Sequence, residues 1–228
     1  MLRSTTMAEA GSMTGDGSSV EVYCRMPSMG EVEQVQSMLL PNSSVLDLGA
    51  GTGRVADALA LLGHRVTAVD DSREMLAHVR NARTVQSRIE DVRLNERFDA
   101  VLLMSNLINY PTPILRRSML ATVAHHLAPN GQAIIQWAPP SLLASRPTGW
   151  TKTLSFDAVQ TTLTIRSNRG GITTGEFVLA VDGRSWRQSL ILQRVSPDTV
   201  RADLARAGLV LTTVDPDSTR WLHARRTS

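Results

Sequence analysis

The sequence has few of the residues that cross-link chains or bind metals. Its 228 residues include one cysteine, Cys24, so no internal disulfide can form. No group of cysteine and histidine residues has the spacing of a zinc site. These absences argue against a disulfide-stabilised secreted domain and against a metal centre, and they favour a reducing, cytoplasmic setting.

Long apolar runs are also missing. No run approaches the roughly 18 residues that a membrane-spanning helix needs. The first residues have neither the basic region nor the apolar region of a secretory signal. Residues 1–19 are rich in Ser, Thr, Gly and Met, and we expect them to form a flexible tail. We therefore expect no membrane partner.

Lysine is almost absent, because Lys152 is the only one and arginine supplies nearly all of the positive charge. The formal net charge is only +3, and the basic residues are scattered along the chain. A nucleic-acid-binding protein needs its basic residues gathered on one face. We therefore expect no nucleic-acid partner. The arginine bias is typical of GC-rich coding, as in some bacteria.

Alternating strand and helix patterns are what the sequence does contain. Strand-like apolar segments fall at 44–49, 64–70, 84–89, 98–104 and 131–140, with helical patterns at 30–40, 52–63, 72–81 and 114–129. This alternation predicts an α/β fold with a Rossmann-like, mostly parallel sheet and helices on both faces. Residues 196–228 add a capped helix and two strands, which makes seven strands.

The predicted secondary structure changes after residue 140. Residues 141–195 are β-rich, and the separators "NRGG" and "DG" are typical of hairpin turns. We predict a small antiparallel insert on the substrate side of a single domain. The expected organisation is a tail at 1–19, a cofactor-binding half at 20–140, the insert at 141–195 and the closing helix and strands at 196–228.

The stretch "VLDLGAGTGR", residues 45–54, predicts a nucleotide site. A strand, a glycine turn and a helix bring backbone N–H groups and a helix N-terminus to one point. The dinucleotide fingerprint would require its third glycine at position 54, which is Arg54 here. Asp47 is a poor neighbour for a pyrophosphate and a good one for the ammonium of a methionine moiety. Asp70 ends the next strand, where a carboxylate can accept both ribose hydroxyls.

Four segments together resemble the class I S-adenosylmethionine-dependent methyltransferases: "VLDLGAGTGR", "VTAVDDS", "RFDAVLLMSNLIN" and "HLAPNGQAIIQW". The resemblance covers residues 20–140 well and residues 196–226 loosely. It implies a Rossmann-like enzyme that uses S-adenosyl-L-methionine and releases S-adenosyl-L-homocysteine.

The resemblance also implies the cofactor residues. Asp47 would lie near the amino group and Asp70 at the ribose. The family's "D-A" pair after the third strand is replaced here by "SRIEDV", so Ile89 and Glu90 are assigned by their spacing from "FD". The other implied residues are Tyr23, Gly49, Ala50, Gly51, Gly53, Asp71, Met75, Met104 and Ser105.

The acceptor side is predicted from "SNLINYP" and from two tryptophans. Asn106, Asn109 and Tyr110 occupy the place where the family sets polar residues over the methyl group. The same residues would also occur if the two amides only stabilised a turn and the tyrosine only packed in the core. Trp137 and Trp150 are candidates for the wall of an apolar substrate pocket. No Ser/His/Asp set is needed, because the cofactor arrives already activated.

These features predict methyl transfer to an N, O or C nucleophile of a small molecule, in bacterial specialised metabolism, by a monomer or homodimer. Two alternatives stay open: a non-catalytic binding protein, and a non-methylating enzyme that uses the same cofactor. An RNA methyltransferase is less favoured, because "SNLINYP" stands where an "NPPY"-like motif would be needed.

Overall fold

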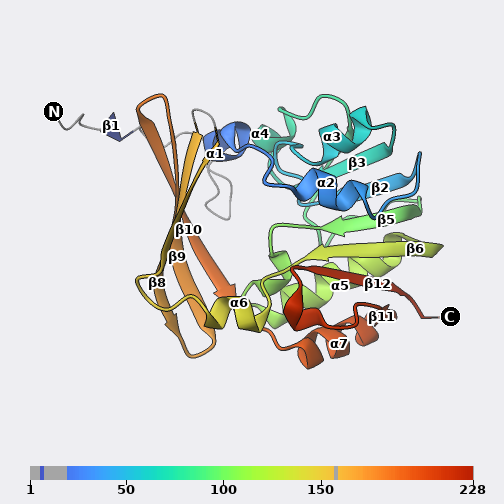
Figure 1. The fold of residues 1–228 in the computed structure, drawn as a ribbon. Coiled ribbons are helices and arrows are strands. Elements are labelled where there is room, and N and C mark those ends of the chain that lie inside the picture. Colours follow the sequence, from blue (N-terminus) through green and yellow to red (C-terminus); the bar gives the residue numbers. More distant parts are fainter. Residues whose placement is uncertain (1–5, 8–19, 157–158, 228) are drawn as a thin grey trace.

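The computed structural model describes residues 6–7, 20–156 and 159–227. It contains two sheets that stand side by side (Figure 1). The larger sheet has seven strands in the order β11-β12-β6-β5-β2-β3-β4. These strands are β2 (Ser44–Leu48), β3 (Arg65–Asp70), β4 (Arg83–Gln86), β5 (Phe98–Leu103), β6 (Leu127–Gln136), β11 (Leu209–Leu211) and β12 (Trp221–Arg226).

The seven-stranded sheet is parallel except for β12, which runs antiparallel to both of its neighbours. Apolar clusters cover both of its faces, as continuous apolar strands require. The helices of this half are α2 (Glu31–Gln36), α3 (Ala56–Leu61), α4 (Arg73–Leu76), α5 (Pro113–His126) and α7 (Pro197–Arg206). The predicted Rossmann-like fold is confirmed.

The second sheet is antiparallel apart from a two-residue strand at its edge, and its order is β1-β10-β9-β8-β7. Its strands are β1 (Thr6–Met7), β7 (Thr151–Phe156), β8 (Val159–Arg169), β9 (Ile172–Val181) and β10 (Arg184–Gln193). Both predicted hairpin turns are present, with positive φ at Gly170, Gly171, Asp182 and Gly183. Strand β7 was not anticipated. Apart from Thr6–Met7, the expected tail lies outside the described residues.

One face of the second sheet packs toward the rest of the molecule. Leu179 and Trp186 on this face pack against Val22 of α1 (Val20–Arg25). Leu192 packs against Leu143 of α6 (Pro140–Ala144), and Figure 1 shows α1 and α6 between the two sheets. The opposite face carries exposed ion pairs of Glu176 with Arg166 and Arg187. The insert is therefore amphipathic, with its apolar face turned inward.

Helix α4 is shorter than the pattern at 72–81 predicts. Ser72 caps it as expected, since its Oγ accepts the N–H of Met75 at 3.1 Å. The backbone N–H groups of residues 80–82, which a longer helix would use, instead donate to the carboxylate of Asp57 at 2.7–3.0 Å. A side chain from the preceding helix thus ends α4 early. Within the described residues, no helix is long and apolar enough to cross a membrane.

Candidate functional site

A pocket lies at the carboxyl ends of β2, β5 and β6, which are neighbours in the sheet. This edge is where open α/β sheets bind their ligands. Tyr23, which lies on α1, completes the pocket from outside the sheet. The residues that line it are Tyr23, Asp47, Gly49, Ala50, Gly51, Thr52, Arg54, Val55, Met104, Ser105 and Gln136.

The glycine turn of this pocket needs glycine for two separate reasons. Gly49, Gly51 and Gly53 have φ values of +75°, +56° and +80°, a region that L side chains rarely adopt. A Cβ at Gly53 would also lie 2.9 Å from a methyl carbon of Val79, whereas a Cβ at Gly51 would meet no atom within 4 Å. Gly53 therefore serves close packing, and Gly51 leaves open space in the pocket.

The carboxylate of Asp47 is buried and lines the pocket beside the glycine turn. It is 2% exposed, and its Oδ1 has no hydrogen-bond partner among the described residues. Burial, and then the charge of Asp70, raise the pKa of Asp47 to about 7, against an opposing effect of Arg54. A buried, unpartnered carboxylate beside a glycine turn fits a cationic group of a ligand, such as an ammonium.

Asp70 organises the glycine turn from the end of β3. One carboxylate oxygen accepts the N–H of Gly51 at 2.8 Å, and the other accepts the N–H of Ser72 at 3.0 Å. The predicted contact of Asp70 with ribose hydroxyls is compatible with this geometry and stays a prediction.

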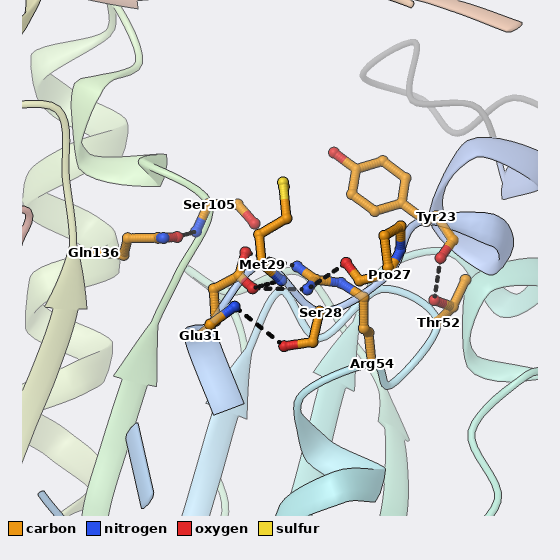
Figure 2. Close-up of polar contacts among 10 residues, drawn as sticks. Tyr23, Pro27, Ser28, Met29, Glu31, Thr52, Arg54, Ser105 and Gln136 are labelled. Atoms are coloured by element: carbon orange, nitrogen blue, oxygen red, sulfur yellow. Dashed lines mark hydrogen bonds and ion pairs between the residues drawn. The ribbon is translucent and has the colours of Figure 1, made fainter. Parts of the chain in front are cut away.

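Arg54 belongs to the site, although sequence reasoning missed it. Its guanidinium binds both carboxylate oxygens of Glu31, at 3.0 and 3.2 Å, and donates to the backbone carbonyl of Pro27 at 3.4 Å (Figure 2). Glu31 is buried, at 8% exposure, and burial opposes its ionisation; the hydrogen bond and charge of Arg54, together with the backbone N–H groups of Met29 and Glu31, outweigh burial and lower the pKa of Glu31. The partners lie 23 residues apart, so no local pattern signals the pair.

Two consecutive strained residues follow β5 beside the pocket. Ser105 and Asn106 have φ values of +57° and +58°, which are uncommon for residues other than glycine. The N–H of Ser105 donates to Oε1 of Gln136 at 2.8 Å (Figure 2), and Oδ1 of Asn106 is buried without a partner among the described residues. Such strain is typical of functional sites. Gln136, at the end of β6, is a further lining residue that sequence reasoning missed, as are Thr52 and Val55.

Asn109, a predicted catalytic residue, is fully buried and occupied by structural bonds. Its side-chain amide donates to the carbonyls of Ala138 and Gln193 and accepts the N–H of Ala138, at 2.8–3.1 Å. It ties the turn after β5 to the ends of β6 and β10. Tyr110 follows it and is half-buried, outside the pocket lining. Of the three catalytic candidates, Asn106 lies next to a lining residue.

Neither tryptophan predicted for the substrate wall lines this pocket. Trp137 is fully buried, and its indole N–H donates to the carbonyl of Thr219 at 2.9 Å. This gives Trp137 a role in the core instead. Trp150 is half-buried, with the guanidinium of Arg146 stacked 4.6 Å from its ring centre.

Seven of the predicted cofactor residues come together in the pocket: Tyr23, Asp47, Gly49, Ala50, Gly51, Met104 and Ser105. The predicted adenine-side residues lie outside its lining. Asp71 is exposed, Met75 is buried, and Glu90 pairs with Arg88. Ile89 packs beside the glycine turn, where it would lie 3.3 Å from a Cβ at position 49. Their roles stay predictions.

Comparison with known proteins agrees with this geometry. Residues 45–131 match the family described as a methyltransferase domain. The cypemycin N-terminal methyltransferase of a Streptomyces species is 32% identical over 139 residues, which cover 55% of this chain and 57% of that relative. The chain thus spans little more than half the length of this curated relative.

Solved methyltransferase structures share the whole fold. The CcbJ methyltransferase of Streptomyces caelestis superimposes with a TM-score of 0.74 at 20% identity, covering 92% of this chain and 96% of that one. The sugar N-methyltransferase KedS8 of a Streptoalloteichus species gives 0.71 at 22% identity, covering 97% and 98%. The domain match over residues 45–131, the strand order and the glycine turn agree with the resemblance of this chain to the class I S-adenosylmethionine-dependent methyltransferases, and the chain shares the fold of the solved members.

Proposed function

We propose that this protein methylates an amine nitrogen of a small molecule, with S-adenosyl-L-methionine as the methyl donor and S-adenosyl-L-homocysteine as the product. The observation that carries the proposal is the unpartnered, buried oxygen of Asp47 in a pocket walled by the glycine turn. A methionine ammonium would satisfy this oxygen, and the glycine backbone leaves room for a ligand to approach.

The residues of the chain divide the work of binding. Asp47 would accept the ammonium of the donor, and Asp70 would accept its ribose hydroxyls while it holds the N–H of Gly51. When bound, S-adenosyl-L-methionine supplies a methyl group on a positively charged sulfur. Asn106 and Tyr110, which follow β5, would orient the acceptor, because alignment and exclusion of water are what remain for the protein to provide.

Two considerations favour nitrogen over oxygen or carbon as the acceptor. A neutral amine attacks with its lone pair and needs no base to remove a proton first. Among the described residues that line the pocket, Asp47 is the one carboxylate, and there is no histidine or lysine. Two similar proteins are named an N-terminal methyltransferase and a sugar N-methyltransferase, whereas other curated relatives are named ubiquinone biosynthesis O-methyltransferases, so the choice of nitrogen rests on the chemistry of the pocket.

The proposed setting is the cytoplasm, with a small-molecule substrate and a monomeric or homodimeric enzyme. Cys24 is a free, exposed thiol, which suits a reducing compartment.

Calorimetric titration with S-adenosyl-L-homocysteine tests the binding part of this proposal. We expect binding to wild type and clearly weaker binding to Asp47→Asn, which keeps the shape of the side chain and removes its charge. No binding by wild type at millimolar ligand would refute the proposal.

Incubation with methyl-labelled donor and a panel of amino sugars, amines and peptides tests the transfer part. We expect label on nitrogen. A protein that binds the donor tightly and labels no member of the panel or of a metabolite extract would favour the non-catalytic alternative, and label on oxygen or carbon would overturn the nitrogen assignment.

A further inference from the structure

Residues 23–31 form a strap that runs from the last turn of α1, through the connecting residues 26–30, to the first residue of α2, and that lies against the glycine turn. Three contacts fasten the strap there. Thr52 Oγ1 donates to the carbonyl of Tyr23 at 3.3 Å, and Arg54 donates to the carbonyl of Pro27 at 3.4 Å. The third is the two-pronged pair of Arg54 with Glu31. Figure 2 shows all three between the strap and the loop that holds Thr52 and Arg54.

Glu31 is the centre of this arrangement. While it binds Arg54, its Oε2 also accepts the N–H of Met29 at 2.7 Å, which shapes the strap itself (Figure 2). The side chains of Arg54 and Glu31 are 20% and 10% exposed, so solvent screens the pair weakly. Charge-assisted, two-pronged bonds of this kind are the strongest hydrogen bonds that side chains make.

The strap is also fastened to the second sheet. Gln188 on β10 donates to the hydroxyl of Tyr23 at 3.2 Å. Val22 of α1 packs against Leu179 and Trp186, and the guanidinium of Arg25 lies 4.9 Å from the centre of the Trp186 ring. Tyr23 therefore lines the pocket while its hydroxyl is held by the insert.

We propose that Glu31 is a positioning residue for the cofactor. By binding Arg54 it keeps the strap closed over the glycine turn, and this closure lowers the dissociation rate of the bound cofactor. This inference rests on the proposed function. Glu31 does not line the pocket, so its influence passes through Arg54 and the strap.

The pair has a second consequence inside the pocket. Arg54 lines the same pocket as Asp47, and it is the one cation among the described lining residues. A guanidinium released by Glu31 would be free to pair with the Asp47 carboxylate. Such a pair would compete with the ammonium of the cofactor. Glu31 thus keeps Arg54 engaged elsewhere and leaves Asp47 available.

The test is the dissociation rate of S-adenosyl-L-homocysteine from wild type and from Glu31→Gln, followed in stopped flow by tryptophan fluorescence, to which Trp186 beside α1 contributes. We expect Glu31→Gln to release the ligand about tenfold faster, as loss of a charge-assisted bond implies. The matched control is Glu96→Gln, which removes the exposed pair of Glu96 with Arg83 at 2.7 Å and should release the ligand at the wild-type rate.

A double variant separates positioning from a general loss of structure. In Glu31→Gln/Arg54→Gln no cation is freed, so the double variant should lose less affinity than the two single variants predict by addition. Additive losses, or an unchanged dissociation rate in Glu31→Gln when wild type binds, would overturn the inference. Failure of wild type to bind would overturn the proposed function as well.

Hydrogen exchange of wild type gives a readout that needs no variant. The Met29 amide, which donates to Glu31, should exchange more slowly when S-adenosyl-L-homocysteine is bound, because the strap then opens less often. Equal exchange with and without bound ligand would contradict a strap that closes over the pocket.

Discussion

At the residue scale, Asp47 combines burial with a nearby like charge, and this makes ligand binding depend on pH. The pKa of Asp47 is raised to about 7 by burial and by Asp70, so much of the free protein carries a neutral Asp47 below that pH. An ammonium needs the charged form. We predict that the affinity for S-adenosyl-L-homocysteine falls by up to roughly tenfold for each pH unit below about 7. Calorimetry between pH 5.5 and pH 8 with Asp47→Asn, which should bind weakly and with less dependence on pH, checks this.

Asp47 also makes the stability of the free protein depend on pH, but in the opposite direction: affinity should rise with pH, whereas the contribution of Asp47 to stability should fall. The pKa of Asp47 is higher in the folded state than in the unfolded state, so between pH 4 and 7 the folded state binds more protons at this site. The contribution of Asp47 to stability is therefore favourable at low pH and is lost as the pH rises toward 7. We predict that Asp47→Asn has a Tm several degrees above that of wild type at pH 8, and a smaller difference at pH 5. A lower Tm for the variant at pH 8 would contradict this.

Two glycines of the turn predict separable effects on stability and on binding. Gly53→Ala combines positive φ with a Cβ 2.9 Å from Val79, so we expect a loss of more than the roughly 1–2 kcal/mol that positive φ alone costs. Gly51→Ala meets open space and should cost only that strain, while its methyl group narrows the pocket. Urea unfolding and ligand titration of both variants test this. Equal stability of the two variants would be inconsistent with it.

At the element scale, the end of α4 depends on Asp57 in the helix before it. Its carboxylate accepts three backbone N–H groups from residues 80–82. We predict that Asp57→Ala lowers the free energy of unfolding by about 1–3 kcal/mol, because it removes three hydrogen bonds to a charged acceptor that hold the chain after α4. Asp91→Asn is the control, since the side chain of Asp91 is 69% exposed and should matter little. Urea unfolding of both variants makes the comparison.

The elements also show where local patterns predict structure well. The capped helix at 196–208 is present as α7, because Ser196 accepts the N–H of Thr199 at 3.1 Å and Gly208 has φ of +75°. Residue 129 is the opposite case. Pro129 was expected to end a helix, but α5 ends at His126 and Pro129 lies within β6. The strand pairing of β6 with β5, which is irregular at this point, decides the boundary instead.

At the scale of the whole molecule, a buried ion pair joins the middle of the chain to its last helix. Arg116 on α5 binds Asp203 on α7 at 2.8 Å, and both side chains are less than 5% exposed. Asp203 also lies near the cations of Arg117 and Arg206, at 3.9 and 3.6 Å. Removal of Asp203 would therefore leave a buried arginine without an ionic partner, whereas removal of Arg116 would leave an aspartate with two nearby cations.

This asymmetry predicts that Asp203→Leu destabilises the protein by about 3–5 kcal/mol, and Arg116→Met by less. The double variant should be more stable than Asp203→Leu alone, because it leaves no unpaired buried charge. Thermal and urea unfolding of the three variants, with Arg83→Met in the exposed pair as control, decide the question. A greater loss from Arg116→Met would contradict the proposed compensation by Arg117 and Arg206.

The sequence by itself determined the strand and helix alternation, the glycine turn, and the places of Asp47 and Asp70 at strand ends, because these depend on neighbours a few residues apart. Only the tertiary structure decided that Asn109 and Trp137 are buried structural residues, and that Arg54 binds Glu31. The burial of a side chain and its choice of partner are set by segments that meet only when the chain folds, such as the strap and the glycine turn. The physical reason is that periodicity records which face of an element is apolar, but not which distant residue that face will meet.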